Sequence, residues 1–372
     1  MSGDSKRKWL LSPELRSSLS AQHQPIAWIY WLDLLLSSAL AWALFVVSYR
    51  AEFGSPLYIV ATVADMFVFL RVGYFMHELP HRSERELPGF SLAWNLLIGI
   101  PILLPSMMMM AHMDHHRTTV YGTERDPEYA PILSWTRGRM VQSVFGFGMV
   151  PLLLPIRFGL LGPLSLLHPR LRDHVVRKFS TVDINANYNR PAPGRDGRGT
   201  WLWQEIACTA FTWGALIATG LGWLALYIHV YRFVVMSGSL MLNQWRTIVI
   251  HRYASDGEPM YGSAQVHDSV TFGGHALLSG LIAPLGSRYH ALHHELPTVP
   301  YHALPAIHRQ LLGDEGYRGT FSPGVTRTWL KQWQERASDP ETRSEPTRDD
   351  VGSRQRTAAA RVDAGERTAT AR

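Results

Sequence analysis

Eight of the seventeen histidines lie in three short clusters whose spacing suits the binding of metal ions. The clusters are His77-Glu-Leu-Pro-His81, His112-Met-Asp-His115-His116 and His290-Ala-Leu-His293-His294. Residues three or four positions apart share a face of a helix, so each cluster can direct two or three imidazoles at one point. Burying eight imidazoles without a common partner would leave many polar nitrogens unsatisfied. The clusters therefore predict a metal centre.

The number of imidazoles indicates more than one metal ion. Eight nitrogen ligands exceed the roughly four to six that a single metal takes, so two metals fit the count. Imidazole suits zinc, copper, iron and nickel, and ligand chemistry alone leaves the metal open. Carboxylates that adjoin the clusters are candidates for orienting the imidazoles from behind, or are charges on the surface of the cap. They are Glu78, Asp114 and Glu295.

The elements that must position these histidines include long apolar segments. Residues 26–48 and 56–75 each reach the length of about 20 residues that crosses a bilayer, and a short turn joins them into a hairpin. Residues 206–228 and 233–250, separated by a polar patch from His229 to Arg232, make a second candidate hairpin.

Two further apolar segments contain prolines, which break helical hydrogen bonding. Residues 90–111 contain Pro101 and Pro105, and residues 140–167 contain Pro151, Pro155 and Arg157. The three clusters must meet on one side of the membrane, so an even number of spans must separate each pair. We therefore expect 90–111 to be re-entrant or interfacial and 140–167 to lie at the interface.

Charge and composition indicate which side of the membrane the clusters face and where the domains begin and end. The net charge is +6, but basic residues flank apolar segments, which favours a cytoplasmic face beside anionic lipid over nucleic acid as a partner. The only cysteine, Cys208, excludes an internal disulfide and is expected to be a small buried apolar residue. We expect a cytosolic segment over 1–25, a membrane domain over 26–335 and a disordered polar tail over 336–372.

The three clusters match the HxxxH, HxxHH and HxxHH boxes of the membrane fatty acid desaturases and related hydroxylases, in the same order. The segment from Tyr289 to Pro305 also resembles the third-box region of that family, and the resemblance covers roughly residues 25–312. It implies an all-α integral membrane fold with four transmembrane helices in two hairpins, interfacial or re-entrant helices, and a cytosolic histidine-rich cap.

The resemblance also implies two iron ions, bound by the eight clustered histidines and by one more at the end of the fourth helix. His251 directly follows the apolar segment 233–250 and looks like that ligand, with His267 and His275 as competitors. One residue departs from the family pattern. Pro80 lies inside the first box, where it disfavours helix at the preceding residue and is expected to kink the last turn.

The activity that the resemblance implies is O2-dependent desaturation of a fatty acyl chain. The substrate would be a free acid, a thioester or an intact lipid. Hydroxylation, or oxidative decarboxylation to a terminal alkene, can use the same three histidine boxes. No fused haem, flavin or ferredoxin motif is present, so a separate donor such as ferredoxin with its reductase is implied.

An alternative function, that of an enzyme from another class, rests on the first cluster alone. His77-Glu78-Leu-Pro-His81 is formally the H-E-x-x-H motif of zinc metalloproteases, with the glutamate as general base. An intramembrane protease would leave six further clustered histidines unexplained, and Pro80 disrupts the helix that the motif requires.

Overall fold

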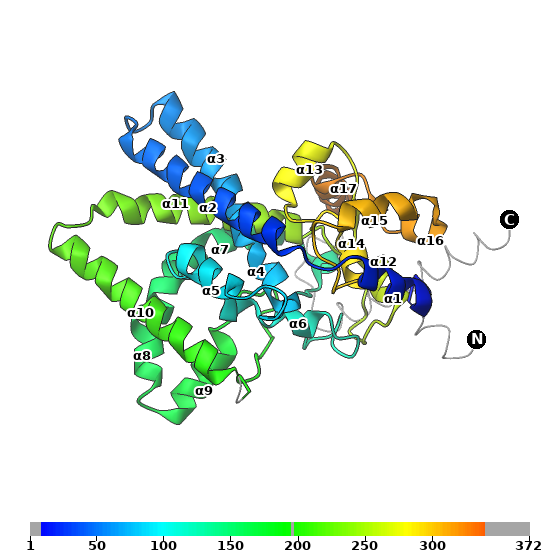
Figure 1. Ribbon diagram of the computed structural model, residues 1–372, viewed down its shortest axis with the longest axis horizontal. Coiled ribbons are helices and arrows are strands. Elements are labelled where there is room, and N and C mark those ends of the chain that lie inside the picture. Colours follow the sequence, from blue (N-terminus) through cyan, green and yellow to red (C-terminus); the bar gives the residue numbers. More distant parts are fainter. Residues whose placement is uncertain (1–8, 195–196, 339–372) are drawn as a thin grey trace.

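The computed structural model describes residues 9–194 and 197–338, and these form a helical protein with one very short sheet (Figure 1). The long helices are α2 (Ala27–Arg50), α3 (Pro56–Gly73), α7 (Arg137–Ile156), α10 (Arg198–Gly220) and α11 (Leu226–Thr247). The shorter ones are α1 (Pro13–Gln22), α4 (Phe75–Glu78), α5 (Phe90–Trp94), α6 (His112–His115), α8 (Gly162–Ser165), α9 (Pro169–Lys178), α12 (Ser263–Asp268), α13 (Ala276–Ile282), α14 (His290–Glu295), α15 (Leu304–Gln310), α16 (Glu315–Arg318) and α17 (Val325–Ser338). Strands β1 (Thr271–Phe272) and β2 (Phe321–Ser322) pair in parallel.

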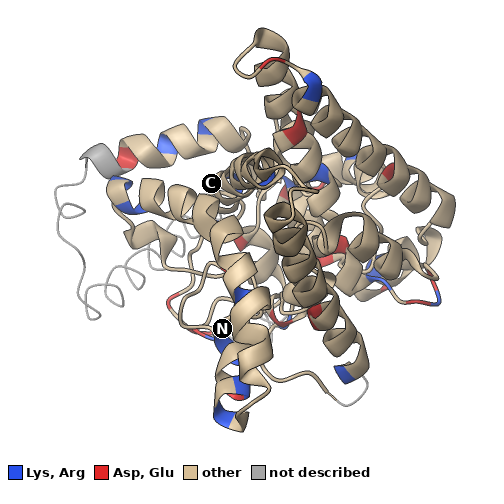
Figure 2. Cartoon of the chain, turned by 90° about the vertical axis from the view of Figure 1, so that its left-hand side faces the viewer, with Lys and Arg blue, Asp and Glu red and all other residues tan. Residues whose placement is uncertain are grey.

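Three helical segments are long and apolar enough to cross a membrane, judged by length and composition over the described residues. They are Ala27–Arg50, Pro56–His81 and Arg137–Ser165. Figure 2 shows that the long helices carry few charged residues along their lengths. Large apolar side chains such as Leu36, Val60 and Leu153 are exposed on these helices, as expected for surfaces that face lipid.

The first predicted hairpin is confirmed by α2 and α3, which pack along each other. The Ser55 hydroxyl caps α3 by accepting from the Tyr58 amide at 3.2 Å, and Pro56 occupies the first turn. Helix α11 packs against both α3 and α7. Glycines permit this close approach, because a Cβ at Gly238 would collide with Met66 of α3.

The second predicted hairpin exists, but its turn lies elsewhere. Helix α10 ends at Gly220 and α11 begins at Leu226, so His229 and Arg232 lie inside α11. Gly222, with φ of 78°, supplies the left-handed turn, a stronger helix stop than the polar residues on which the prediction relied. His229 instead reaches across the turn to the Thr219 hydroxyl at 2.8 Å. Cys208 is fully buried on α10, as predicted.

The segment 90–111 turns back on itself, as expected. Its helical part, Phe90–Gly99, is too short to span a bilayer, and Leu103 has a positive φ of 61° in the turn that follows. The Asn95 side chain accepts from the Ser106 amide and donates to the Ser106 hydroxyl, both at 2.8 Å. These bonds hold the outgoing and returning chain together.

The segment 140–167 does not break at its prolines. Helix α7 continues through Pro151 and Pro155, then widens into a π-helix over Arg157–Leu161 before α8. Buried Arg157 donates to Glu205 of α10 at 2.7 Å and to the Phe179 carbonyl at 2.8 Å. The chain then returns through α9, and the Ile184 amide donates to the Pro127 carbonyl at 3.2 Å, beside the histidine-rich cap.

The N-terminal and C-terminal segments both contain helix. Backbone amides of Leu10 and Leu11 donate to Glu295, which fixes the segment before α1 against α14. Helix α17 includes residues 336–338, so the first part of the predicted tail is helical. The remainder of the predicted tail and residues 1–8 lie outside the described residues.

Candidate metal centre

Each histidine cluster sits on a short helical turn at the base of the long helices. The first begins on α4 and ends in the 3-10 turn Leu79–His81, where Pro80 tightens the helix, so the predicted kink is confirmed. The second lies on α6 and the residue after it, and the third on α14. Despite the tightened turn, the rings of His77 and His81 lie 5.9 Å apart and face the same centre.

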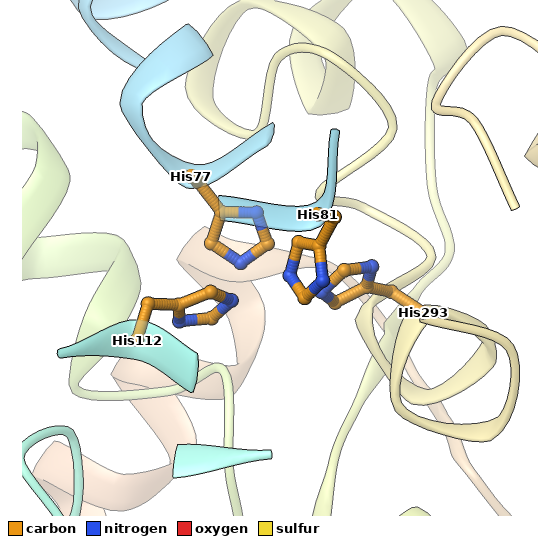
Figure 3. A group of neighbouring side chains, drawn as sticks. All are labelled: His77, His81, His112 and His293. Carbon is orange, nitrogen blue, oxygen red and sulfur yellow. The ribbon is translucent and has the colours of Figure 1, made fainter. Parts of the chain in front are cut away.

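One group of imidazoles joins all three clusters. Ring nitrogens of four histidines lie within 4.8 Å of one another, and Figure 3 shows their rings pointing toward a common centre. The four are His77, His81, His112 and His293. A fifth imidazole belongs with them, because His116 Nε2 lies 2.9 Å from His112 Nε2 and 3.0 Å from His293 Nε2.

A second group of four imidazoles lies beside the first. Its members are fully buried and also have ring nitrogens within 4.8 Å of one another: His115, His251, His290 and His294. His290 Nε2 lies 3.1 Å from His251 Nε2 and 3.0 Å from His294 Nε2. The structure thus brings His251 to the clusters, whereas His267 bonds the Ser263 carbonyl and His275 precedes α13.

Burial keeps these imidazoles in the state that binds metal. It lowers the pKa of five imidazoles well below the ordinary value, and neighbouring imidazoles add to the effect: those of His116, His251, His290, His293 and His294. Neutral imidazole is the form that coordinates a metal ion. At His115 burial also disfavours the charge, but Asp126 and Glu128 outweigh it and raise the pKa.

Two acidic residues that the sequence analysis missed orient imidazoles from behind. Asp126, fully buried, accepts from His115 Nδ1 at 2.8 Å, and Glu128 bonds His112 Nδ1 at 2.5 Å. Burial raises the pKa of Glu128, but the neighbouring His112 and His115 outweigh it and lower the pKa to about 2. A proton held on Nδ1 leaves the Nε2 lone pair directed at the centre.

The second group has further orienting contacts. His251 Nδ1 lies 2.8 Å from the Tyr121 hydroxyl, which donates to Asp268 at 2.8 Å. Gln265 contacts His294 Nδ1 at 3.1 Å. The signal available in the sequence was weak: Asp126 and Glu128 flank a proline ten residues after the second cluster, and Asp268 follows a histidine outside the clusters.

The carboxylates adjacent to the clusters in sequence have other partners. Glu78 accepts from Tyr30 and from Arg82, and Asp114 accepts from Tyr188 at 2.7 Å. Glu295 accepts from the amides of the N-terminal segment. These partners are not the clustered imidazoles, because helix geometry turns a neighbour in sequence about 100° away from the metal-facing side.

The donor set fits two metal ions. Within the described residues, Nε2 of His77, His81 and His115 is buried without a hydrogen-bond partner. Other Nε2 atoms converge at about 3 Å on neighbours of the same kind. Uncompensated buried nitrogens of this kind are costly, and a cation at each centre would satisfy them together.

The zinc-protease alternative is not supported by this geometry. His77 and His81 share their centre with His112 and His293 instead of forming a separate two-histidine site. Glu78 forms an ion pair with Arg82 at 3.1 Å and bonds Tyr30, so it is not free to act as a general base.

A cavity of about 120 Å3 opens beside the first group. His77 and Glu128 line its inner end, and its walls come from α3, α11 and the loop around residue 183. Most of the lining is apolar, including Phe69, Met236 and Leu240. An apolar chain in this cavity would lie directly against the histidine cluster.

Comparisons with known proteins agree with the site. A sequence model of the family described as fatty acid desaturase matches residues 53–321. A ceramide hydroxylase from Caulobacter vibrioides (strain NA1000 / CB15N) is 36% identical over 306 residues, which covers 81% of this chain and 87% of the relative. The matched region contains all nine histidines of the two groups.

Proposed function

This chain belongs to the fatty acid desaturase family, and we propose that it is a membrane enzyme that uses two histidine-bound iron ions and O2 to oxidise the acyl part of a lipid. The observation that carries the proposal is the convergence of nine imidazoles on two adjacent centres. Bound iron supplies activated-oxygen chemistry able to remove hydrogen from an unactivated carbon, which no side-chain acid, base or nucleophile can do.

The residues of the chain position that chemistry. His77, His81, His112, His116 and His293 would hold one iron, and the remaining four histidines, His115, His251, His290 and His294, the other. Asp126 and Glu128 fix the tautomer and the ring orientation of their imidazoles. The cavity beside His77 would hold the lipid carbon against the first centre.

Hydroxylation of a ceramide-like lipid is the reaction that we favour, because the similarity to a ceramide hydroxylase extends over most of both chains. Desaturation is the second candidate, supported by the family match. Decarboxylation to a terminal alkene has no observation of its own in its favour. We also propose a separate reductant, such as ferredoxin with its reductase.

The experiment is lipid analysis by mass spectrometry of cells that express the protein, together with the metal content of the purified enzyme. A hydroxylated ceramide that is absent from a His115→Ala control supports the first candidate, and a new double bond supports the second. Two irons per chain are expected. Zinc in place of iron, or no lipid change in cells that also supply ferredoxin and its reductase, would contradict the proposal.

We further propose four membrane spans, α2, α3, α10 and α11, with the histidine centre on the cytoplasmic face. Length and composition select α2 and α3 among these four, and they also select Arg137–Ser165, which we place at the membrane interface. The return of the chain from α8 to the cap by residue 184 supports a lateral position for α7 and α8, which leaves an even number of crossings. Four basic residues on α9 support a position near anionic lipid: Arg170, Arg172, Arg177 and Lys178.

Cysteine labelling tests this topology at three exposed turn residues, Phe53, Trp223 and Leu167, in a Cys208→Ser background. A membrane-impermeant maleimide applied to intact cells is expected to label Phe53→Cys and Trp223→Cys but not Leu167→Cys. Labelling of Leu167→Cys from outside would mean that α7 and α8 cross the membrane, and would overturn the four-span arrangement.

A further inference from the structure

The cavity beside His77, the inner cavity, is too small for a whole lipid. Its volume of about 120 Å3 is below the roughly 300–1,000 Å3 of sites that enclose a drug-sized ligand. A second cavity of about 600 Å3, the outer cavity, extends along α7. Four residues line both cavities and mark the junction between them: Phe147, Val182, Asp183 and Ile184. Of the two cavities, the outer one has the room that the bulk of a lipid requires.

The lining of the outer cavity is amphipathic. Phe147, Val150 and Leu154 belong to a long apolar face that α7 supplies. Arg139 and Lys178 line the same cavity, and both side chains are exposed. Neither of these two cations forms an ion pair with a described carboxylate, so both are available to the oxygens of a ligand. An apolar face with separate cationic groups suits a molecule that has hydrocarbon chains and an oxygen-bearing headgroup.

The outer cavity borders the bilayer. Leu153 and Ile156 belong to its lining and are 58% and 49% exposed on α7. Large apolar side chains exposed on a long apolar helix indicate contact with hydrocarbon. The basic residues of α9, which include Lys178 of the cavity lining, favour a position near the headgroups of anionic lipid. A lipid can therefore enter the outer cavity from the membrane without passing through water.

The loop that forms the junction is fastened to the metal centre. The Ile184 and Asn185 amides donate to the Pro127 carbonyl at 3.2 and 3.3 Å. The Asn185 side chain donates to the Asp126 carbonyl at 2.7 Å, and Asp126 is one of the two carboxylates that orient imidazoles. These bonds hold the junction in place relative to the imidazoles, so a chain that passes through it reaches His77 in a defined position.

Asp183 is the polar residue among the four at the junction. It is half-buried and forms no hydrogen bond or ion pair with another described residue. Burial raises its pKa to about 7, with Glu128 adding to the rise and Lys178 opposing it. A carboxyl group withdrawn from water without a partner is costly, and a hydroxyl or an N–H of the ligand would supply the partner. Asp183 therefore favours a lipid with a hydrogen-bond donor at its linkage over a plain acyl chain.

We propose that the outer cavity binds the part of an intact membrane lipid that is not oxidised, while one chain of that lipid passes the junction to His77. At the junction, Asp183 accepts a hydrogen bond from a hydroxyl or an N–H of the lipid linkage. This site rests on the proposed function and specifies its substrate class. The substrate is a lipid that enters from the bilayer, and not a free acid or a thioester that enters from water.

The first test closes the junction after the protein has folded. Val182→Cys in a Cys208→Ser background is purified with its metal and labelled with a bulky maleimide, and the binding of a ceramide is measured in detergent. The label should weaken ceramide binding by about tenfold or more and leave the iron content unchanged. Ala186→Cys carries the same label on an exposed residue of the same loop, outside both cavity linings, and should bind the ceramide normally. Unchanged ceramide binding in the labelled Val182→Cys protein would overturn the inference.

The second test addresses Asp183 and the class of ligand. Asp183→Leu should weaken ceramide binding about tenfold, as one buried hydrogen bond allows, and leave unchanged the binding of a methyl ester of the same acyl chain, which has no donor. Equal losses for both ligands, or tighter binding of the corresponding acyl-coenzyme A than of the ceramide by the wild-type protein, would contradict the proposed site. Ceramide binding that follows both expectations without any oxidation product would instead leave the lipid site standing and remove the proposed reaction.

Discussion

The two histidine groups differ in how the protein holds them. In the group of His115, His251, His290 and His294 every member is buried, and three of the four Nδ1 atoms contact a side chain behind the ring. The other group contains five imidazoles, includes the partly exposed His81, and borders the cavity through His77. Of its members, His112 has a carboxylate on Nδ1.

This difference indicates that the two centres depend on their ligands to different degrees. The four-histidine centre has no imidazole beyond the four that converge, and its geometry depends on residues behind the rings. The five-histidine centre has an additional imidazole and faces the cavity beside His77. We therefore expect the first to be sensitive to every change and the second to tolerate the loss of one ligand better.

The largest effect is expected from His115→Ala. This change leaves three imidazoles at the four-histidine centre, so that centre should lose its metal and oxidation should fall to background. Iron per chain, measured on the purified protein, should drop by about half. His174→Ala, an exposed histidine on α9, is the control and should retain both iron and product.

The counterpart is His116→Ala, which leaves the four converging imidazoles of the five-histidine centre in place. We expect this variant to retain most of its iron and a reduced but measurable activity. Equal losses in His115→Ala and His116→Ala would show that the two centres do not differ in the way that their ligand numbers suggest.

A smaller effect is expected from Asp126→Asn. The exchange weakens the bonds of Asp126 to His115 and to the Gly122 amide while conserving shape. Loss of such an orienting carboxylate typically costs about 10- to 100-fold in metal affinity or activity. The measurement is activity and iron retention against a chelator series, and unchanged retention would contradict an orienting role.

Tyr121→Phe should lower metal affinity by about tenfold, the lower end of that range, because the hydroxyl connects His251 to Asp268 without a full charge of its own. Retention of the second iron during dialysis is the readout. Tyr188→Phe removes a buried hydroxyl that contacts Asp114 and no imidazole, and it should leave iron retention unchanged.

The smallest effect is expected from Asp114→Asn. Asp114 lies between two histidines in the sequence, but its partners are Tyr188 and the largely exposed Arg117. An exposed ion pair contributes little, so activity should change by less than about twofold. A loss as large as that of Asp126→Asn would mean that nearness in the sequence, and not in space, selects the residues that support the metals.

The sequence by itself predicted the histidines that converge and the main apolar helices that hold them. The spacing of the three clusters predicts metal binding, because a helix places residues three and four apart on one face. The apolar lengths predict the α2–α3 hairpin, and the prolines of 90–111 predict its reversal, because these are local properties of the chain. His251 was predicted because the family resemblance implies a further ligand at the end of an apolar segment, where His251 stands.

Tertiary structure decided which imidazoles share a centre and which residues support them. His115 and His116 are adjacent in the sequence but belong to different groups, because successive side chains on a helix diverge by about 100°. Asp126, Glu128, Tyr121 and Gln265 reach the imidazoles through folding of distant loops, which no local pattern reports. The cavity beside His77 likewise exists only because α3, α11 and the loop around residue 183 pack together.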